Sequence, residues 1–138
     1  MKNKLIIIGA SGHGKVVADI AIKMNKWQSI AFLDDDEFIK TSMGLEVIGE
    51  TSDAFKYKDE GDFFVAIGNN ATREKIQEKL EEEGLTIVKL IHPSAVIGSE
   101  VEIGIGTAVM AGAVVNSSSR IEKGCIINTS CSLDHDNV

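Results

Sequence analysis

The chain has 138 residues, of which 43% are hydrophobic and 25% are charged, so we expect a folded core rather than a disordered segment. Its net charge of −7 and its lack of a basic run argue against a nucleic-acid-binding protein, which needs clustered lysine and arginine side chains. The sequence has no apolar run long enough to span a membrane and no signal peptide, so we expect a cytoplasmic protein that does not insert into a membrane.

The chain opens with the pattern of a strand, a glycine turn and a helix. Residues 4–8 form a continuous apolar run, as expected for a strand buried on both faces of a parallel sheet. The turn Gly9–Gly14 follows directly, and a helix is predicted next, with apolar side chains on one side at Val16, Val17, Ile20, Ala21 and Met24. This order is typical of a nucleotide-binding unit, in which the unpaired N–H groups at the helix start suit a phosphate.

The spacing of the glycines distinguishes this turn from a dinucleotide-binding one. Gly9, Gly12 and Gly14 form the pattern G-x-x-G-x-G, whereas NAD-binding turns have G-x-G-x-x-G. The sequence therefore argues against an NAD-binding oxidoreductase domain. It leaves open whether the turn binds another ligand or is only a tight connection between strand and helix.

Polar residues and a glycine follow the next predicted strands. The strand at residues 29–33 ends in four acids, Asp34–Glu37, about twenty residues past the glycine turn, where a ribose hydroxyl would be bound. An acidic loop is often only a solvated turn, and we expect one of these acids to contact a ligand rather than all four. A buried strand at residues 63–67 ends at Gly68, on the same edge of the sheet as the glycine turn and the acids.

The remaining elements of this first part are short. We expect a strand at residues 45–48, a short helix at 51–57, a helix at 71–83 capped by Asn70, and a strand at 86–90. Together the elements predict a Rossmann-like α/β domain over residues 1–90, with four or five strands and two or three helices.

From residue 91 onward an aliphatic residue returns at every sixth position, namely Ile91, Ile97, Ile103, Val109, Val115, Ile121, Ile127 and Leu133. A six-residue period matches neither an α-helix nor an alternating strand, and it is typical of a parallel β-helix. Cys125 and Cys131 occupy equivalent positions of successive repeats, so we expect them on different faces of the coil, without a disulfide. A metal site would need more ligands at tighter spacing than the chain offers.

This pattern resembles the left-handed β-helix of the hexapeptide-repeat acyltransferases, in which three repeats make one triangular coil. The resemblance predicts that residues eighteen apart stack at about the usual strand spacing, in columns such as Ile91, Val109 and Ile127, or Ile97, Val115 and Leu133. The last repeat ends partway round a third coil, with no polar cap after it. We therefore expect residues 91–138 to be the start of a truncated β-helix domain, continued by further coils or covered by another chain. A structural solenoid without an active site is the alternative.

The two parts together resemble one group of bacterial sugar acetyltransferases over the whole chain. The group includes the sialic-acid O-acetyltransferases and the N-acetyltransferases that act on UDP-4-amino-sugars in bacillosamine synthesis. The segments that carry the resemblance are Gly9–Gly14, Phe32–Asp35, Ala66–Asn70, Ile91–Pro93, Ile121–Gly124, Ile127–Ser130 and Asp134–Asp136. It implies a front domain that holds a UDP-sugar and a homotrimeric β-helix that holds acetyl-CoA between neighbouring subunits.

The same resemblance assigns site residues. It implies that Ser11, Gly12 and His13 contact the phosphate and the sugar. It also implies that the uridine lies at Asp34 and Asp35, and that Gly68 forms part of the wall of that pocket. It implies His135 as the general base, with Asp136 in place of an acid that is often Glu. A histidine can take the proton of an attacking amine or hydroxyl, and a neighbouring carboxylate can fix its tautomer. The family's acetyl-CoA contacts have no counterpart in this chain and are expected on later coils.

Three functions remain open from the sequence. The leading one is an acetyl-CoA-dependent transfer of an acetyl group to the amino group of a UDP-linked amino sugar, for surface-glycan synthesis. A sugar O-acetyltransferase of the sialic-acid type would use the same base. The third is a non-catalytic module that binds nucleotide sugars or serves in assembly. It would have the same α/β domain and β-helix but no acetyl transfer.

Overall fold

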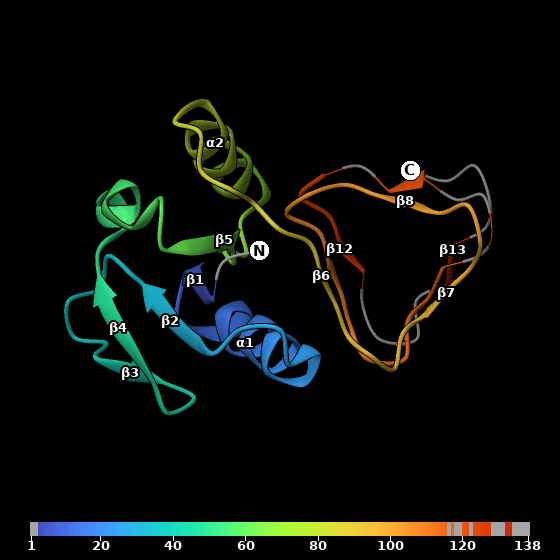
Figure 1. Ribbon diagram of the computed structural model, residues 1–138, viewed down its shortest axis with the longest axis horizontal. Helices are drawn as coiled ribbons and strands as arrows, with labels where there is room; N and C mark the ends of the chain where they lie inside the picture. The colour runs from blue at the N-terminus through green and yellow to red at the C-terminus, as the bar shows by residue number, and fades with distance from the viewer. Residues whose placement is uncertain (1–2, 116, 118–119, 122, 128–131, 134–138) are drawn as a thin grey trace.

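The computed structural model of the chain describes residues 3–115, 117, 120–121, 123–127 and 132–133. It consists of an α/β part built on a five-stranded sheet and a three-sided coil of short strands, which lies beside that sheet (Figure 1). The coil is seen end-on as a triangle, and one of its sides faces the α/β part.

The sheet has the strand order β3-β4-β2-β1-β5. Its strands are β1 (Lys4–Ile8), β2 (Ser29–Leu33), β3 (Thr41–Ser42), β4 (Leu45–Gly49) and β5 (Gly61–Val65). All neighbouring strands are parallel except β3 and β4. Strand β1 pairs on both sides, and four of its residues are fully buried, which explains the continuous apolar run at the start of the chain.

Helices cover both faces of this sheet. They are α1 (Gly12–Met24), the 3₁₀ helix η1 (Thr51–Tyr57) and α2 (Asn70–Glu82). Because side chains alternate along a strand, Leu5 and Ile7 pack in a cluster with α1, whereas Ile6 and Ile8 pack in a second cluster with η1 and α2. The predicted α/β arrangement, with helices on both faces of a mostly parallel sheet, is thus present.

Two details of the prediction are wrong. The cap of α2 is Asn69, whose side chain accepts a hydrogen bond from the Thr72 N–H at 2.9 Å, and not Asn70. Residues 86–90 do not form a strand of the sheet, because only Ile87 makes a bridge to β5 and Leu90 already belongs to the coil. Strand β3, which has only two residues, was not predicted.

The coil is built of two-residue strands in three parallel sheets. The strands are β6 (Leu90–Ile91), β7 (Val96–Ile97), β8 (Glu102–Ile103), β9 (Ala108–Val109), β10 (Val114–Val115), β11 (Arg120–Ile121), β12 (Ile126–Ile127) and β13 (Ser132–Leu133). Their orders are β12-β9-β6, β11-β8 and β13-β10-β7. Every pairing joins residues eighteen apart, so both predicted columns are confirmed in register.

The three sides of the coil differ in the residue that precedes each inward aliphatic. On the β12-β9-β6 side, Leu90 and Ala108 are fully buried in the same cluster as α1 and β1, so the coil and the sheet share one core. On the β11-β8 side, the exposed Glu102 and Arg120 form an ion pair. The third side carries Val96, which is 59% exposed.

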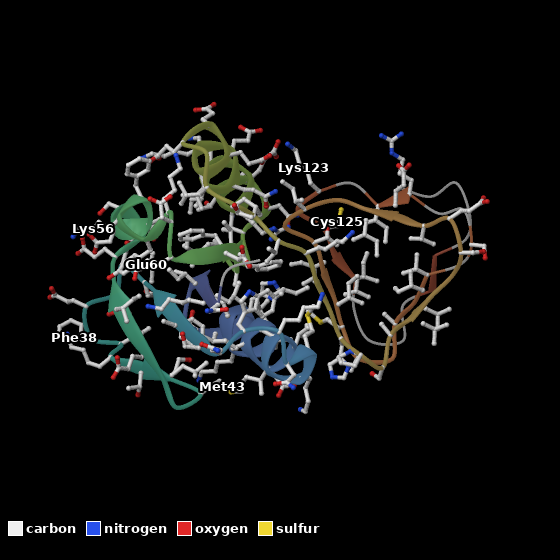
Figure 2. The ribbon with its side chains drawn as sticks, viewed as in Figure 1. Phe38, Met43, Lys56, Glu60, Lys123 and Cys125 are labelled. Atoms are coloured by element: carbon white, nitrogen blue, oxygen red, sulfur yellow. The ribbon has the colours of Figure 1, made fainter. Side chains whose placement is uncertain are left out.

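Helix α2 makes a second contact with the coil, at a corner. Gln77 is buried, and its Nε2 donates a hydrogen bond to the Ile105 carbonyl oxygen at 3.3 Å. Gly106 follows at a φ of +75°, and a Cβ there would collide with the Gln77 Oε1. Figure 2 shows Lys123 and Cys125 on the same side of the coil, toward α2, whereas Phe38 and Met43 lie at the far edge of the sheet.

This corner predicts that Gly106→Ala is more destabilising than Gly44→Ala. Both glycines have a φ of +75°, but a Cβ at Gly44 meets nothing within 4 Å. We expect Gly44→Ala to cost about 1 kcal/mol of unfolding free energy for the left-handed backbone. Gly106→Ala should cost about 1–3 kcal/mol more for the collision, and Gln77→Ala should relieve part of that excess. Urea unfolding measures the unfolding free energy of each variant. Equal losses of unfolding free energy in Gly44→Ala and Gly106→Ala would contradict the contact between Gly106 and Gln77.

Candidate functional site

Three loops meet at the carboxyl edge of the sheet. Strands β2 and β5 both pair with β1 in parallel, so the loops that follow these three strands emerge at the same edge. The loops after β1 and β5 touch, because a Cβ on Gly9 would lie 2.8 Å from the Ala66 carbonyl oxygen. The structure therefore brings the predicted Ser11, Gly12 and His13 to the edge that also carries Gly68.

The glycine loop is fixed by hydrogen bonds at both backbone groups of Ala10. Its N–H donates to the Asp34 Oδ2 at 2.8 Å, and its carbonyl oxygen accepts from the Ser42 hydroxyl at 2.6 Å. The other Asp34 oxygen accepts from the Asp36 N–H at 2.8 Å. Asp34 thus shapes the loop, a structural role that the sequence did not indicate. Ser42 was missed because a two-residue strand has no recognisable sequence pattern.

The second predicted uridine contact, Asp35, belongs to a different neighbourhood. Its Oδ1 accepts a hydrogen bond from the Thr51 N–H at the start of η1, at 2.8 Å. It lines a hollow of about 580 Å³ between η1 and α2, which pack on the opposite face of the sheet from α1. The structure therefore ties Asp34 to the glycine loop and Asp35 to η1.

The glycines of the edge fall into two kinds. Gly9 has a φ of +107°, so its backbone conformation favours glycine. A Cβ on Gly14 would collide with the Gly9 carbonyl oxygen, so packing requires glycine there. Gly12 and Gly68 have no left-handed φ, and a Cβ on either would meet nothing within 4 Å. Neither the backbone nor the packing of the protein requires glycine at these two positions. Both leave open space at the edge.

Donors face that space at the start of α1. Ser11 is the exposed N-cap, and its side chain makes no capping hydrogen bond. The first N–H groups of a helix have no partner within it, so those of Gly12 and His13 are available to an anion. Such donors and open glycine positions together suit a phosphate group.

His13 is half-buried in the first turn of α1. Burial lowers the pKa of its imidazole from the ordinary value of 6.5, and the nearby charge of Arg73 lowers it further. Its Nε2 is buried and has no hydrogen-bond partner among the described residues. A neutral ring with an unsatisfied nitrogen can donate to or accept from a ligand, according to its tautomer.

The predicted catalytic pair, His135 and Asp136, lies outside the described residues. So does Cys131, while Cys125 is partly buried. Within the described part of the chain, no group of His, Cys, Asp and Glu residues could hold a metal ion. No helix there is both long and apolar enough to cross a membrane.

Comparisons with known proteins identify the family. Residues 4–80, more than half of the chain, match the model of the PglD N-terminal domain. The chain belongs to the PglD N-terminal domain family. The match covers all three loops of the edge.

A curated relative supports the same membership. The UDP-N-acetylbacillosamine N-acetyltransferase of Bacillus subtilis (strain 168) is 36% identical over 115 residues, which are 80% of this chain and 52% of the relative. This chain thus spans about half the length of this curated relative.

Solved structures related to this PglD-family chain extend the likeness into the coil. The acetyltransferase domain of PglB from Neisseria gonorrhoeae FA1090, in complex with acetyl coenzyme A, is 40% identical, with a TM-score of 0.93 over 99% of this chain and 66% of that one. PerB from Caulobacter crescentus, in complex with CoA and GDP-perosamine, is 36% identical, with a TM-score of 0.88 over 96% of this chain and 63% of that one.

Proposed function

We propose that this protein is an acetyl-CoA-dependent sugar N-acetyltransferase, which transfers an acetyl group to the amino group of a UDP-linked amino sugar. In this proposal, residues 1–90 form the nucleotide-sugar-binding domain, and residues 91–138 begin a left-handed β-helix that carries the transfer chemistry. The relatives support it: one is named for acetylating a UDP-sugar, one binds acetyl coenzyme A, and one binds CoA together with a GDP-sugar.

The observation that carries the proposal is the open space at Gly12 and Gly68. Two glycines that neither conformation nor packing requires leave room for a ligand to approach the backbone closely. The N-terminus of α1 supplies N–H donors at the same edge, and the sugar diphosphate is an anion. Ser11 and His13 would contact the phosphates and sugar, with Asp34, which is hydrogen-bonded to the glycine loop, toward the base. Asp35 is bonded to η1 and is not part of this proposal.

The catalytic step needs a base near the acceptor amine. The amine attacks the thioester carbonyl of acetyl-CoA, a C–N bond forms, and the C–S bond breaks. Coenzyme A leaves as the thiolate with the electron pair of that bond, and the amine proton must leave. His135 would take that proton, and Asp136 would hold its tautomer and favour the imidazolium. The contacts to acetyl-CoA would come from coils beyond those of this chain.

The first test fills the open space. Gly12→Ala should weaken binding of UDP or GDP about tenfold or more, because the added methyl group occupies the position of the ligand. Its unfolding free energy should stay within about 0.5 kcal/mol of the unaltered chain, since the methyl meets no protein atom. Calorimetric titration measures the affinity, and Lys26→Ala, past the other end of α1, is the control. NAD binding in place of UDP and GDP would contradict the proposal.

The second test concerns the base. In a longer form of the protein that carries the coils for acetyl-CoA, His135→Ala should lower the rate of acetyl transfer to a UDP-4-amino-sugar by about 10²–10⁴-fold, with little change in UDP affinity. The control is His92→Ala, because His92 accepts a hydrogen bond from the Ser94 N–H at 3.0 Å and lies at the start of the coil. An unchanged rate in His135→Ala would overturn the assignment of His135 as the base. No acetyl transfer by the unaltered protein would leave it as a binding or assembly module.

We also propose that the protein forms a homotrimer. Of the three sides of the coil, one packs on α1 and one carries the Glu102–Arg120 ion pair, which leaves the side with Val96 for a second subunit. Val96→Glu should therefore convert a trimer to monomers in sedimentation, because it would bury a charge in the interface. Glu102→Gln, on the ion-pair side, should leave the trimer intact. A purely monomeric unaltered chain would contradict this assembly.

A further inference from the structure

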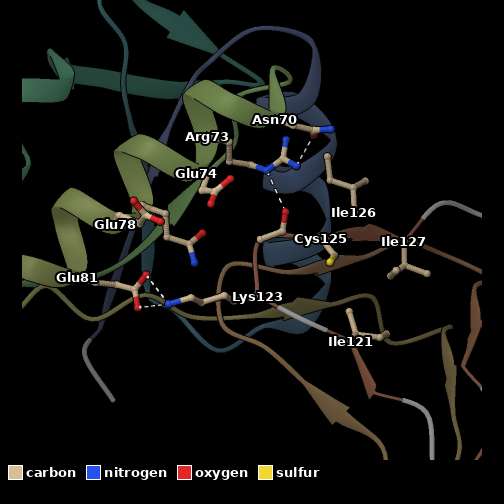
Figure 3. A pocket seen from close by; sticks show the side chains of 12 residues that line it. Asn70, Arg73, Glu74, Glu78, Glu81, Ile121, Lys123, Cys125, Ile126 and Ile127 are labelled. Carbon is tan, nitrogen blue, oxygen red and sulfur yellow. Dashed lines mark hydrogen bonds and ion pairs between the residues drawn. The ribbon is translucent and has the colours of Figure 1, made fainter. Parts of the chain in front are cut away.

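A buried arginine joins the edge of the sheet to the coil. Arg73 lies near the start of α2 and is only 6% exposed. Its Nη1 donates to the carbonyl oxygens of Ile67 at 2.9 Å and Gly68 at 3.3 Å, its Nη2 to the Asn70 Oδ1 at 2.7 Å, and its Nε to the Gly124 carbonyl oxygen at 3.1 Å. The guanidinium lies beside a cavity of about 650 Å³ that is lined by residues of α2 and the coil, and Figure 3 shows its contact with Asn70.

The acceptors around this guanidinium are all neutral. Three are backbone carbonyl oxygens and one is an amide oxygen, so the positive charge is held by dipoles and not by a carboxylate in these contacts. Glu74 and Glu78 line the same cavity, but both are exposed, and none of the ion pairs among the described residues includes Arg73. Burying a charge is costly unless something in its surroundings compensates for it.

The charge of Arg73 reaches both loops that border the open space. It bonds the backbone at Gly68 directly, and it is close enough to His13 to lower the pKa of that ring. A cation placed behind two loops that present N–H donors and open glycine positions adds to their attraction for an anion. Low local polarity around a buried group makes this attraction stronger than it would be at the surface.

We propose that Arg73 is a positioning residue of the sugar-nucleotide site, which holds the Gly68 loop in its binding shape and supplies buried positive charge for the diphosphate. This inference rests on the proposed function, because it names a residue that acts on the ligand of that site. Arg73 acts through the loop and the electric field, and it makes no contact with the sugar.

Gln77 provides a matched control for a purely structural role. It lies one turn further along α2, is buried like Arg73, and also donates to a carbonyl oxygen of the coil, that of Ile105. It has no charge and no bond to the Gly68 loop. If Arg73 only attached α2 to the coil, Arg73→Gln and Gln77→Met would behave alike, with lower stability and the same affinity for nucleotides.

The experiment compares UDP with uridine, because only UDP carries the diphosphate. Calorimetric titration of the 138-residue chain, at a temperature where each variant is folded by circular dichroism, should show UDP affinity at least tenfold lower in Arg73→Gln. Uridine affinity should fall far less, because uridine depends on the shape of the Gly68 loop but not on the charge of Arg73. Arg73→Lys should keep most of the UDP affinity because it keeps the charge, and Gln77→Met should keep all of it. In NMR titrations, the His13 pKa should rise in Arg73→Gln and not in Gln77→Met.

The outcomes separate this inference from the proposed function. UDP binding that Arg73→Gln leaves unchanged, or that falls no more than uridine binding, would overturn the role of Arg73 alone. No binding of UDP or GDP by the unaltered chain would overturn the proposed function and this role with it.

If Arg73→Gln does not fold, Asn70→Asp gives the test. It puts a carboxylate against the guanidinium at an exposed helix start, where the fold tolerates an acid, and it should weaken UDP binding at least tenfold. Unchanged UDP affinity there would also overturn the role of Arg73.

Discussion

The six-residue register of the coil is the constraint on which the arrangement of the whole chain depends. The inward residue of each strand must stack on its equivalents eighteen residues away, as Ile91, Val109 and Ile127 do. The residue before each inward residue then points outward, and residues eighteen apart point outward from the same side of the coil. On one side these residues are Leu90 and Ala108, which complete the core beneath α1. A shift of the register by one residue would turn those two side chains inward and leave α1 without its partner.

The coil is therefore attached to the sheet in two chemically different ways. The contact with α1 is apolar and fully buried, so its strength comes mainly from surface removed from water. The contact with α2 is polar and consists of hydrogen bonds from Arg73 and Gln77 to backbone oxygens at a corner, with an ion pair between Lys123 and Glu81 at the surface. Both helices begin directly after the loops at the carboxyl edge of the sheet, so both attachments bear on the loops that form the candidate site.

Much of the fold could be predicted from the sequence, because it depends on periodicity. The apolar run of β1, the glycine turn and the stacked columns of the coil each repeat a simple spacing, and the structure confirms them. The predictions that were wrong depend on single contacts. Asn69 and Asn70 are equally good caps by type, and only the backbone at Asn69 selects it. Residues 86–90 have the composition of a strand, but the start of the coil at Leu90 ends their pairing with the sheet.

The candidate site divides in the same way. Its position at the strand ends follows from topology, so the loops with Gly12 and Gly68 could be named from sequence. The roles of Asp34 and Ser42 as anchors of the Ala10 backbone could not, because they depend on a short strand next to the acidic loop. Arg73 was missed for a further reason: a basic residue in a predicted helix ordinarily faces solvent, and nothing in the sequence reveals that the coil covers it.

The shared core has a consequence for how such proteins can be recombined. A cut between residues 90 and 91 would divide strand β6 itself and expose the buried surface of α1. The unit that can be exchanged between proteins is therefore not the sheet alone. It is the sheet together with the coil side that carries Leu90 and Ala108, so a front domain grafted onto a foreign coil would need small or aliphatic residues at those two outward positions.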